Sequence, residues 1–337
     1  MKLAVIGTGK IVHEAFYALE RAYRIETVAI FGRPHSREKA EVLAKKYNIQ
    51  EVYTDYAELL KKTAADTVYI GLVNSVHFDY AREALRAGKN VILEKPFVST
   101  TAEAEELKEI AEQRGLFLFE AITVLHSPVF EKMAASLPRL GSIRLALLNY
   151  SQYSSRYDAY RGGTVLPAFD PAKGAGALGD INVYNIHYCV ALFGVPSAVH
   201  YYANRGFNGV DLSGVLVMEY DGFQAVCAGA KDSDSPCFVS IQGEDGYMRI
   251  DGKPNLAPSL DVVYVQKDEP PVPDAAGAMQ RPTEKEHIEN RPYHRMTQEF
   301  KDFAQIIDER NYHARDTFLE ETLGVVKVLE MAKASTK

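Results

Sequence analysis

The sequence predicts an α/β protein with a doubly wound parallel sheet followed by an α+β domain that has a large, mainly antiparallel open sheet. Up to about residue 120, short apolar runs alternate with longer amphipathic runs. After residue 121, segments of alternating polarity follow one another at hairpin-like spacing. The 337 residues, 47% hydrophobic and 25% charged, are enough for two cores. We therefore expect a first domain over residues 1–120 and a second over 121–337.

Strands and helices alternate strictly in the first domain, which requires crossover connections and hence parallel strands. The expected strands are 2–6 (KLAVI), 26–31 (ETVAIF), 66–71 (DTVYIG), 90–94 (NVILE) and 116–121 (LFLFEA). The expected helices are 10–22, 36–47, 76–88 and 101–115. Several of these strands are apolar almost throughout, as is typical of strands that helices cover on both faces.

The second domain has a different rhythm, with alternating segments typical of an antiparallel sheet. The expected strands lie within 142–153, 197–205, 212–220, 223–231 and 238–252. One helix is expected at about 179–192, and a long amphipathic helix at about 320–333 is expected to pack back on the first domain. The Pro-rich stretch 267–277 (KDEPPVPDAAG) is expected to be an exposed loop.

Charge and cysteine content exclude several classes of protein. Asp and Glu outnumber Lys and Arg by 45 to 38, so neither nucleic acid nor a membrane surface is an expected partner. Cys189, Cys227 and Cys237 lie far apart without a companion His at zinc-ligand spacing, so neither a disulfide framework nor a metal site is indicated. The apolar run 3–6 is too short for a signal peptide, and no run reaches the roughly 20 residues of a membrane span. We expect a cytoplasmic protein.

A short glycine motif follows the first expected strand. Gly7-x-Gly9-x-x-Val12 stands between a strand and a helix, which is the setting of a dinucleotide-binding turn whose backbone N–H groups face a pyrophosphate. Val12 occupies the position of the usual third small residue, so a plain structural turn is the alternative. The residues expected to hold the pyrophosphate are Gly7, Thr8, Gly9, Lys10 and Ile11.

The end of the second strand indicates which nicotinamide cofactor is bound. NAD sites place a carboxylate there for the ribose 2′-hydroxyl, whereas NADP sites place a basic residue near the 2′-phosphate. Gly32, Arg33, Ser36 and Arg37 offer room, charge and a hydroxyl before the first carboxylate, Glu38. This pattern favours NADP(H) over NAD(H). The alternative is a solvated Arg beside a helix N-terminus.

Further motifs complete a family pattern. Gly7-x-Gly9 is followed by Asn74-x-x-His77, by Glu94-Lys95-Pro96, and by a Gly-rich turn leading to Asp180 and Tyr184. This order resembles the Gfo/Idh/MocA family of oxidoreductases over nearly the whole chain. The resemblance implies a Rossmann domain and hydride transfer between NAD(P) and a hydroxyl or carbonyl carbon of a sugar, cyclitol or diol. It also implies a homo-oligomer, dimer or tetramer, formed through the open sheet.

The resemblance narrows to one branch and leaves the substrate open. Tyr184, where many members have His, is similar to the dimeric dihydrodiol dehydrogenase and glucose–fructose oxidoreductase branch, which also favours NADP. Asn182 replaces a usual glycine, and His187 lies where sugar dehydrogenases often have an acid. After Glu120, the stretch AITVLHSP lacks the aromatic and Arg pattern of many relatives.

Hydride transfer at a C–OH carbon needs a group that exchanges the hydroxyl proton. Lys95 is the first candidate, because it follows a strand at the carboxyl edge of the parallel sheet, where ligands bind. Partial burial near a cationic nicotinamide is expected to lower its pKa towards neutrality. The alternative is a surface lysine paired with Glu94.

A polar stripe on the helix near residue 180 gives further candidates. Asp180, Tyr184 and His187 fall at i, i+4 and i+7, so they are expected on one face and in the catalytic set. Asp180 could instead be a helix cap, and His187 a buried structural histidine. Tyr184 could donate the proton in place of Lys95 or act in a pair with it; the sequence does not rank the two.

The remaining candidates follow other strands or lie in one loop. By resemblance, Asn74 and His77 contact the nicotinamide ribose, although His77 could cap the next helix. Glu94 and Glu120 end neighbouring strands and could hold the ribose or the nicotinamide. The loop residues expected to meet substrate, or alternatively another subunit, are Tyr153, Arg156 and Tyr157.

Three functions are compatible with these residues. The leading one is an NADP(H)-dependent oxidoreductase acting on a small polyhydroxylated or carbonyl compound. The second is a glycoside hydrolase of the same superfamily that retains NAD and catalyses no net redox change. The third is a non-catalytic NADP-sensing or scaffold protein, which the joint presence of Lys95, Asp180 and Tyr184 disfavours.

Overall fold

The N-terminal part of the computed structural model, which describes residues 1–336, is a six-stranded parallel sheet in the order β3-β2-β1-β4-β5-β6. Its strands are β1 (Lys2–Ile6), β2 (Glu26–Phe31), β3 (Glu51–Tyr53), β4 (Thr67–Ile70), β5 (Asn90–Glu94) and β6 (Leu118–Ala121). Its helices are α1 (Lys10–Leu19), α2 (Arg37–Tyr47), α3 (Tyr56–Lys62), α4 (His77–Arg86) and α5 (Thr101–Gln113). The order reverses between β1 and β4, so the predicted doubly wound sheet is confirmed.

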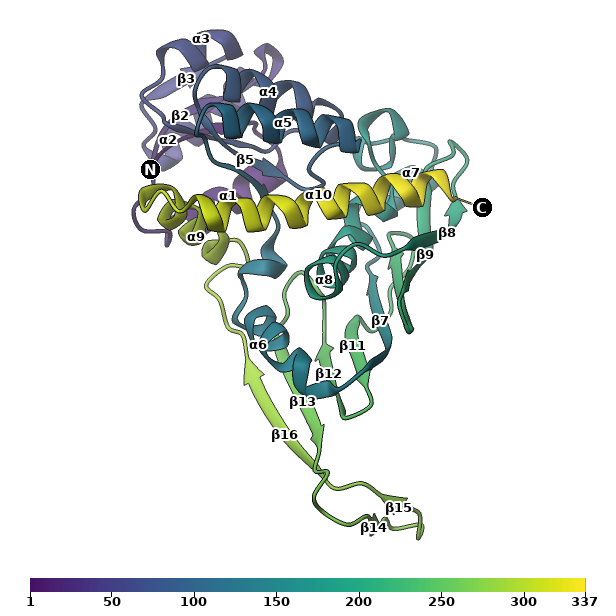
Figure 1. The fold of residues 1–337 in the computed structure, drawn as a ribbon. Coiled ribbons are helices and arrows are strands. Elements are labelled where there is room, and N and C mark those ends of the chain that lie inside the picture. The colour runs from purple at the N-terminus through teal and green to yellow at the C-terminus, as the bar shows by residue number, and fades with distance from the viewer. Residues whose placement is uncertain (337) are drawn as a thin grey trace.

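The second sheet has eight strands in the order β16-β13-β12-β11-β7-β10-β9-β8 (Figure 1). Neighbours pair antiparallel except β7 and β10, which pair in parallel, so the predicted mainly antiparallel sheet is also confirmed. The strands are β7 (Ile143–Ser151), β8 (Ala198–Arg205), β9 (Asp211–Tyr220), β10 (Phe223–Ala230), β11 (Phe238–Gly243), β12 (Gly246–Asp251), β13 (Ser259–Val265) and β16 (Thr283–Glu289).

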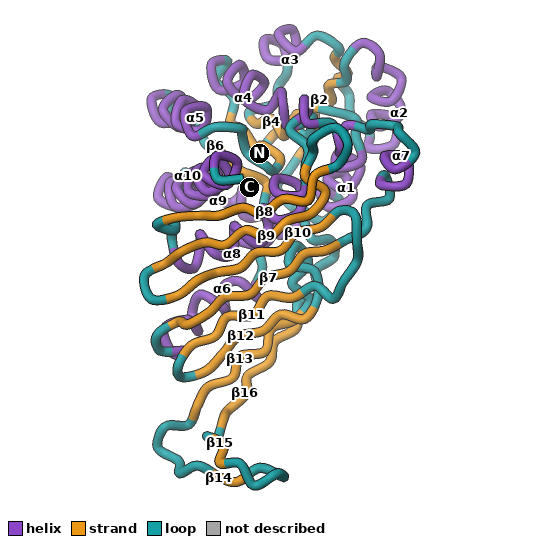
Figure 2. Tube along the Cα trace, turned by 90° about the vertical axis from the view of Figure 1, so that its right-hand side faces the viewer, coloured by secondary structure: helices purple, strands orange, loops and turns teal. Residues whose placement is uncertain are grey.

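One face of this sheet is covered and the other is open. Helices α6 (Pro128–Ser136), α8 (Val183–Phe193) and α10 (Tyr312–Ala334) pack on one face and bury its apolar side chains (Figure 2). On the opposite face Val215 and Tyr247 remain 38% and 43% exposed. The sheet therefore has the alternating pattern of a surface that is buried on one side only.

The last helix, α10, crosses both sheets. It contacts α5 and β6 of the first sheet, and α8 and β8 of the second (Figure 1). It begins at Tyr312, earlier than the expected residue 320, because Asn311 caps its N-terminus by accepting a hydrogen bond from the Ala314 amide. The first turns of α10 are polar, so their sequence does not show the apolar stripe of a packed helix. Arg315 in these turns is nevertheless buried and donates a hydrogen bond to the Leu116 carbonyl.

Two further α-helices and a short hairpin lie outside the elements named so far. Helix α7 (Tyr157–Arg161) follows β7, and α9 (Thr297–Asp308) packs against α1. The Pro-rich stretch is exposed and carries β14 (Val272–Pro273), which pairs with β15 (Met279–Gln280). Among residues 1–336, no helix is both long enough and apolar enough to cross a membrane.

Candidate active site

A cavity of about 560 Å³ lies at the carboxyl ends of β1, β4 and β5, and its other side is lined by residues that follow β7, among them Arg156, Asp180 and Lys231. Many of the predicted site residues meet in it. Those lining it are Gly7, Thr8, Gly9, Lys10, Ile11, Arg33, Ser36, Asn74, Glu94, Lys95, Arg156, Asp180 and Tyr184. The predicted residues that do not line it are Gly32, Arg37, His77, Glu120, Tyr153, Tyr157 and His187.

The glycine turn has the shape that a dinucleotide requires. Gly7 has φ +126°, and a Cβ on it would lie 2.5 Å from the Gly71 carbonyl oxygen. A Cβ on Gly9 would have no heavy atom within 4 Å, so space is open in front of the uncapped N-terminus of α1. A helix N-terminus open to a cavity is a ready anion site, so these residues fit a pyrophosphate.

The missing third glycine of the motif is compensated on the neighbouring strand. Val12 packs where a small residue is usual, and its Cγ2 atom would lie 2.9 Å from a Cβ on Gly71. Since Gly71 has no side chain, the helix still approaches the sheet closely. The absence of the third glycine therefore does not reduce the fit of the turn to a dinucleotide.

The end of the cavity next to β2 is cationic. Arg33 and Lys39 line it, and their side chains make no hydrogen bond or ion pair with any described residue; Ser36 lies between them in sequence. Arg37 points elsewhere and pairs with Glu41 at 2.8 Å. Gly32 lies beneath, where a Cβ would come within 3.0 Å of the Ala40 side chain. These features fit an additional phosphate group on the adenosine ribose.

The opposite end of the cavity holds a buried charge cluster. The Lys95 ammonium donates to the Asp180 carboxylate at 2.9 Å and to the Asp180 carbonyl at 2.8 Å. Lys231, only 2% exposed, binds the other oxygen of the same carboxylate at 2.8 Å. Lys231 also donates to the Ala168 carbonyl at 2.6 Å. Two ammonium groups therefore share one carboxylate.

This cluster sets the protonation states of its members. Burial disfavours the charged ammonium, but the negative charge of Asp180 outweighs burial and raises the pKa of Lys95 above its usual value. Burial likewise opposes ionisation of Asp180, but Lys95 and Lys231 hold the pKa of that carboxyl well below its usual range. The lowered Lys95 pKa expected from the sequence is therefore not found in the protein alone, in which Lys95 is held as an ammonium.

Asp180 lies in a π-helical turn, Leu178–Asn182, directly before α8. Asp211 fixes the start of this turn, because it accepts hydrogen bonds from the Leu178 amide at 2.7 Å and from Tyr201 at 2.8 Å. Asn182 donates to the Cys227 carbonyl at 2.9 Å and so ties the turn to β10. The turn and the strand that leads to Lys231 are thus held in fixed register.

Tyr184 completes the reactive end. Its ring centre lies 5.0 Å from the Lys95 nitrogen, and its hydroxyl makes no hydrogen bond within the described residues. Glu94 accepts a hydrogen bond from Tyr69 at 2.7 Å, and burial raises the pKa of Glu94 above its usual value. Arg295 lines the same end and pairs with Glu14 at 2.7 Å.

His77 and Glu120 lie beneath the cavity and support its floor. His77 is fully buried, with one ring nitrogen 3.0 Å from the Pro96 carbonyl and the other 3.2 Å from the Leu72 carbonyl. Glu120 accepts a hydrogen bond from the Phe97 amide at 2.9 Å. Both side chains therefore hold the segment that follows Lys95.

His187 lies deeper than Asp180 and Tyr184. Its Nδ1 is 2.9 Å from Glu321 of α10 and its Nε2 is 3.4 Å from Glu120 of β6. Burial would lower the pKa of His187, but these two carboxylates raise it to about 10. His187 lies about one helical turn beyond Tyr184, where α10 covers α8. Its side chain therefore connects α8 with β6 and α10 instead of facing the cavity.

In the tyrosine-rich loop that follows β7, one predicted residue lines the cavity and two others pack within the loop. Arg156 lines the cavity and its guanidinium makes no hydrogen bond or ion pair within residues 1–336. Tyr153 donates to Asp158 at 2.6 Å, and its ring packs edge-on against Tyr157. The two tyrosines therefore shape the loop, whereas Arg156 reaches the cavity.

Sequence reasoning missed several residues of the wall: Glu14, Lys39, Gly71, Lys173, Lys231 and Arg295. The sequence pattern could have indicated Lys231, since a lysine directly follows the apolar run FQAVCAGA of β10. No sequence pattern indicated Arg295, because it lies in the polar segment between β16 and α9, far from every motif.

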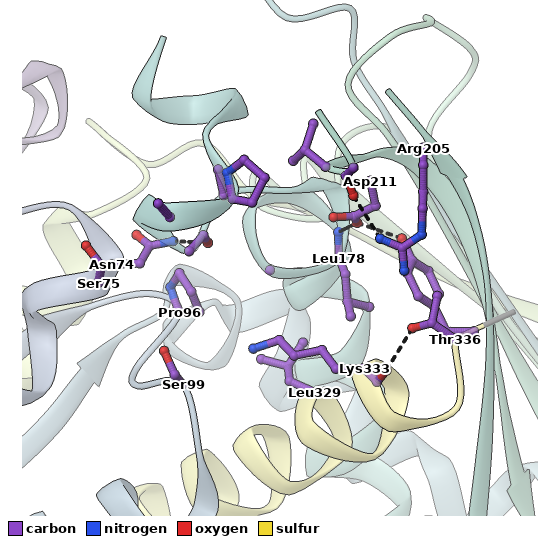
Figure 3. A pocket seen from close by; sticks show the side chains of 18 of the residues that line it. Asn74, Ser75, Pro96, Ser99, Leu178, Arg205, Asp211, Leu329, Lys333 and Thr336 are labelled. Carbon is purple, nitrogen blue, oxygen red and sulfur yellow. Dashed lines mark hydrogen bonds between the residues drawn. The ribbon is translucent and has the colours of Figure 1, made fainter. Parts of the chain in front are cut away.

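A second cavity of about 450 Å³ is lined in part by Asn74, Leu178 and Leu329 (Figure 3). Asn74 borders both cavities and donates to the Gly174 carbonyl at 2.9 Å, which forms part of the wall between them. Arg205, Asp211 and Lys333 lie around the second cavity, but none of the Lys95 cluster does. The first cavity is therefore the candidate active site.

Comparison with known proteins agrees with this geometry. Residues 1–122 match the oxidoreductase family with an NAD-binding Rossmann fold, and residues 138–249 match the GFO/IDH/MocA C-terminal domain. The chain belongs to the Gfo/Idh/MocA family. The predicted family and the predicted class of enzyme, an NAD(P)-dependent oxidoreductase, are thereby confirmed.

Two bacterial proteins match nearly the whole chain. Scyllo-inositol 2-dehydrogenase (NADP(+)) IolU of Bacillus subtilis is 33% identical over 99% of this chain and 96% of its own length. The uncharacterized oxidoreductase YgjR of Escherichia coli is 33% identical over 92% of this chain and 89% of its own length. The trans-1,2-dihydrobenzene-1,2-diol dehydrogenase of Xenopus tropicalis is 29% identical over 74% of each chain.

A solved structure shares the fold over the full length. The 3-ketoreductase KijD10 of Actinomadura kijaniata, in complex with NADP and TDP-benzene, matches with a TM-score of 0.82 at 22% identity. The match covers all of this chain and 98% of KijD10. At this identity the match establishes the shared fold and nothing finer.

Proposed function

We propose that this protein transfers a hydride between NADP(H) and a hydroxyl or carbonyl carbon of a small polyhydroxylated compound, such as a sugar, a cyclitol or a diol. The observation that carries the proposal is the cluster of Lys95, Asp180 and Tyr184 at the end of β5, inside the cavity that also contains the glycine turn. The names of the dehydrogenase relatives support the substrate class.

The chain divides the work between its two parts. In this proposal residues 1–120 bind the cofactor, with the amides of the glycine turn on the pyrophosphate and Asn74 and Glu94 near the nicotinamide end. Residues 121–337 supply the substrate wall and the contacts between subunits. The bound cofactor supplies or accepts the hydride at the reacting carbon.

The proton is handled by the protein. Lys95 is held as an ammonium by Asp180, so it can donate a proton to the oxygen of a carbonyl substrate during reduction. The unpartnered hydroxyl of Tyr184 is the second candidate donor, and in that case Lys95 would stabilise the charge that develops on the substrate oxygen. Asp180 holds Lys95 in place for either role.

NADP(H) is the proposed cofactor, because Arg33 and Lys39 line the adenosine end and neither side chain pairs with a carboxylate of residues 1–336. The NADP(+) in the name of IolU supports the same choice. NAD(H) is the weaker alternative, since no acidic side chain in the described part of the chain lines this end to bind a free ribose 2′-hydroxyl.

The test is a fluorescence titration with NADPH and with NADH, followed by a screen of sugars, cyclitols and carbonyl compounds for a change in NADPH absorbance. We expect tighter binding of NADPH and turnover of at least one compound in the screen. Lys95→Ala should lower kcat by about 100-fold or more while NADPH affinity stays within a few-fold. Cleavage of a glycoside with no net change in NADPH would overturn the proposal in favour of a hydrolase that retains its cofactor.

We further propose that the protein is a cytoplasmic homo-oligomer joined through the open face of the eight-stranded sheet. Leu147, Val226 and Val217 lie side by side there on three neighbouring strands, and no helix packs on this face within residues 1–336. All three cysteines are free thiols, which supports a reducing compartment.

A further inference from the structure

Lys231 is the buried charged group of the cavity that the proposed chemistry does not yet use. Its ammonium has three N–H donors, of which the Ala168 carbonyl takes one and the Asp180 carboxylate takes another. The third has no oxygen or nitrogen acceptor within residues 1–336, although Lys231 lines the cavity. A buried donor without an acceptor is costly unless a ligand or water satisfies it.

Lys95 repeats this pattern on the other side of the same carboxylate. It uses two donors on Asp180, and its third has no acceptor in the described part of the chain. The two ammonium groups therefore bind different oxygens of one carboxylate, and each has one N–H donor left over. With the free hydroxyl of Tyr184, they make a set of donors at the reactive end of the cavity.

Both ammonium groups lie within hydrogen-bond distance of one carboxylate, so a ligand with two oxygens a few bonds apart could contact both. The two oxygens of a carboxylate are separated by two bonds, and those of a vicinal diol or α-hydroxy ketone by three. If Lys95 and Tyr184 meet the oxygen on the reacting carbon, Lys231 is placed to meet the oxygen on the next carbon. The net charge of the two lysines and Asp180 is +1, which favours oxygen lone pairs and disfavours cationic substituents.

The position of Lys231 is fixed before any substrate enters. It follows β10, which Asn182 and Asn185 tie to the start of α8 through the Cys227 and Ala228 carbonyls. Its ammonium also lies 4.7 Å from the centre of the Phe169 ring. A donor held in this way loses little conformational entropy when it binds a substrate, so it can discriminate between related substrates.

We propose that Lys231 is a specificity-determining residue that binds the oxygen on the carbon next to the reacting carbon, so that the enzyme requires vicinal oxygens in its substrate. This inference rests on the proposed function and adds the substrate feature that the site selects. It assigns Lys231 a contact with substrate and not the proton transfer.

The test compares each substrate with its analogue lacking the neighbouring hydroxyl. The probes are scyllo-inositol with a deoxyinositol, and cyclohexane-1,2-diol with cyclohexanol, all with NADP+. In the wild type we expect kcat/KM to favour the vicinal compound, and Lys231→Met to reduce that preference by about 10- to 100-fold, the value of a hydrogen bond to a charged group. Calorimetric titration of the same probes into the NADP+ complex should show a parallel loss in affinity for the vicinal compound only.

A second variant covers the case in which Lys231→Met does not fold. Lys231→Arg keeps the positive charge beside Asp180 but moves the donors, so it should fold and still lose most of the preference. Lys301→Met, a lysine outside the cavity, is the control and should keep the wild-type preference.

The outcomes separate the two proposals. Equal losses for both members of a pair in the Lys231 variants would make Lys231 merely structural and overturn the inference. A wild-type enzyme that turns over the compounds without any preference for vicinal oxygens would overturn it as well. Failure of the wild type to turn over any sugar, cyclitol, diol or carbonyl compound would instead overturn the proposed function itself.

Discussion

At the scale of single residues, the cavity is characterised by which charged groups already have partners. Lys95, Lys231 and Arg295 are each paired with a carboxylate inside the protein. Arg33 and Arg156 are not paired with any described residue, although both line the cavity. Unpaired cations in a cavity are the groups with most to gain from an anionic ligand.

Arg33→Ala tests the assignment of the adenosine end. It should weaken NADPH binding by about 10- to 100-fold and change NADH binding by less than about 3-fold, because only NADPH carries the 2′-phosphate. Fluorescence titration measures both affinities. Arg37→Ala is the matched control, since Arg37 pairs with Glu41 outside the cavity and should change neither affinity. Equal weakening of both cofactors by Arg33→Ala would contradict the assignment.

Glu299→Gln tests a buried carboxyl group below the reactive end. Glu299 is fully buried, neither carboxyl oxygen has a hydrogen-bond partner within residues 1–336, and burial together with Glu94 raises its pKa well above the usual value. As pH rises past its usual pKa, the unfolded chain ionises while the folded chain does not, so the wild type loses stability. Gln cannot ionise and avoids this loss.

The melting temperature of Glu299→Gln minus that of the wild type should therefore be larger at about pH 8 than at about pH 5. Each unit of pKa shift is worth about 1.4 kcal/mol of stability. Scanning calorimetry at both pH values measures the difference. Exposed Glu309 at the end of the same helix is the control, and Glu309→Gln should show no comparable trend. A difference for Glu299→Gln that does not change with pH would show that Glu299 ionises freely in the folded protein.

At the scale of secondary-structure elements, the sequence predicts best where one local rule is sufficient. Apolar runs such as 90–94 were recognised as strands because parallel strands covered on both faces are apolar throughout. The edge strand β3 was not recognised, since three half-buried residues make no pattern. Likewise, i, i+4 spacing brought Asp180 and Tyr184 together, but the partners of His187 come from β6 and α10, which the sequence does not place.

His187→Gln tests the ion cluster that joins α8 to these two elements. The substitution leaves Glu120 and Glu321 buried without a cation, which should cost about 3–5 kcal/mol at about pH 6. Because the folded pKa of about 10 lies above the ordinary 6.5, the stabilisation is complete below 6.5 and is lost as pH rises through 10. Urea denaturation at several pH values should show the gap to wild type narrowing towards pH 10.

The same variant separates a structural role from a catalytic one. His187 does not line the cavity, so kcat/KM of His187→Gln should stay within a few-fold of wild type at a temperature where both are folded. Glu321→Gln should follow the same stability trend, because it removes one carboxylate of the same cluster. A loss of turnover of 100-fold or more in fully folded His187→Gln would place this histidine in the reaction.

At the scale of the whole molecule, the two faces of the eight-stranded sheet have different surroundings. Its covered face holds α8, and the π-helical turn before α8 carries Asp180, whereas its open face has no helix on it within the described residues. On the open face Val226 pairs with Leu147 on one side and Val217 on the other, in an apolar row across three strands. An apolar sheet face of this kind is typical of a subunit interface.

Val226→Asp tests whether copies of the chain meet there. We expect light scattering of the wild type to give a multiple of 37.5 kDa and Val226→Asp to shift the mass towards that of one chain, because each copy would bring an unpaired charge into a symmetric apolar contact. Val42→Asp is the matched control, since Val42 on α2 is 67% exposed and far from this face, and it should leave the mass unchanged. A wild type that scatters as one chain at every concentration would rule out the interface. A mass that Val226→Asp does not change, in a variant that melts like the wild type, would move the subunit contact to another surface.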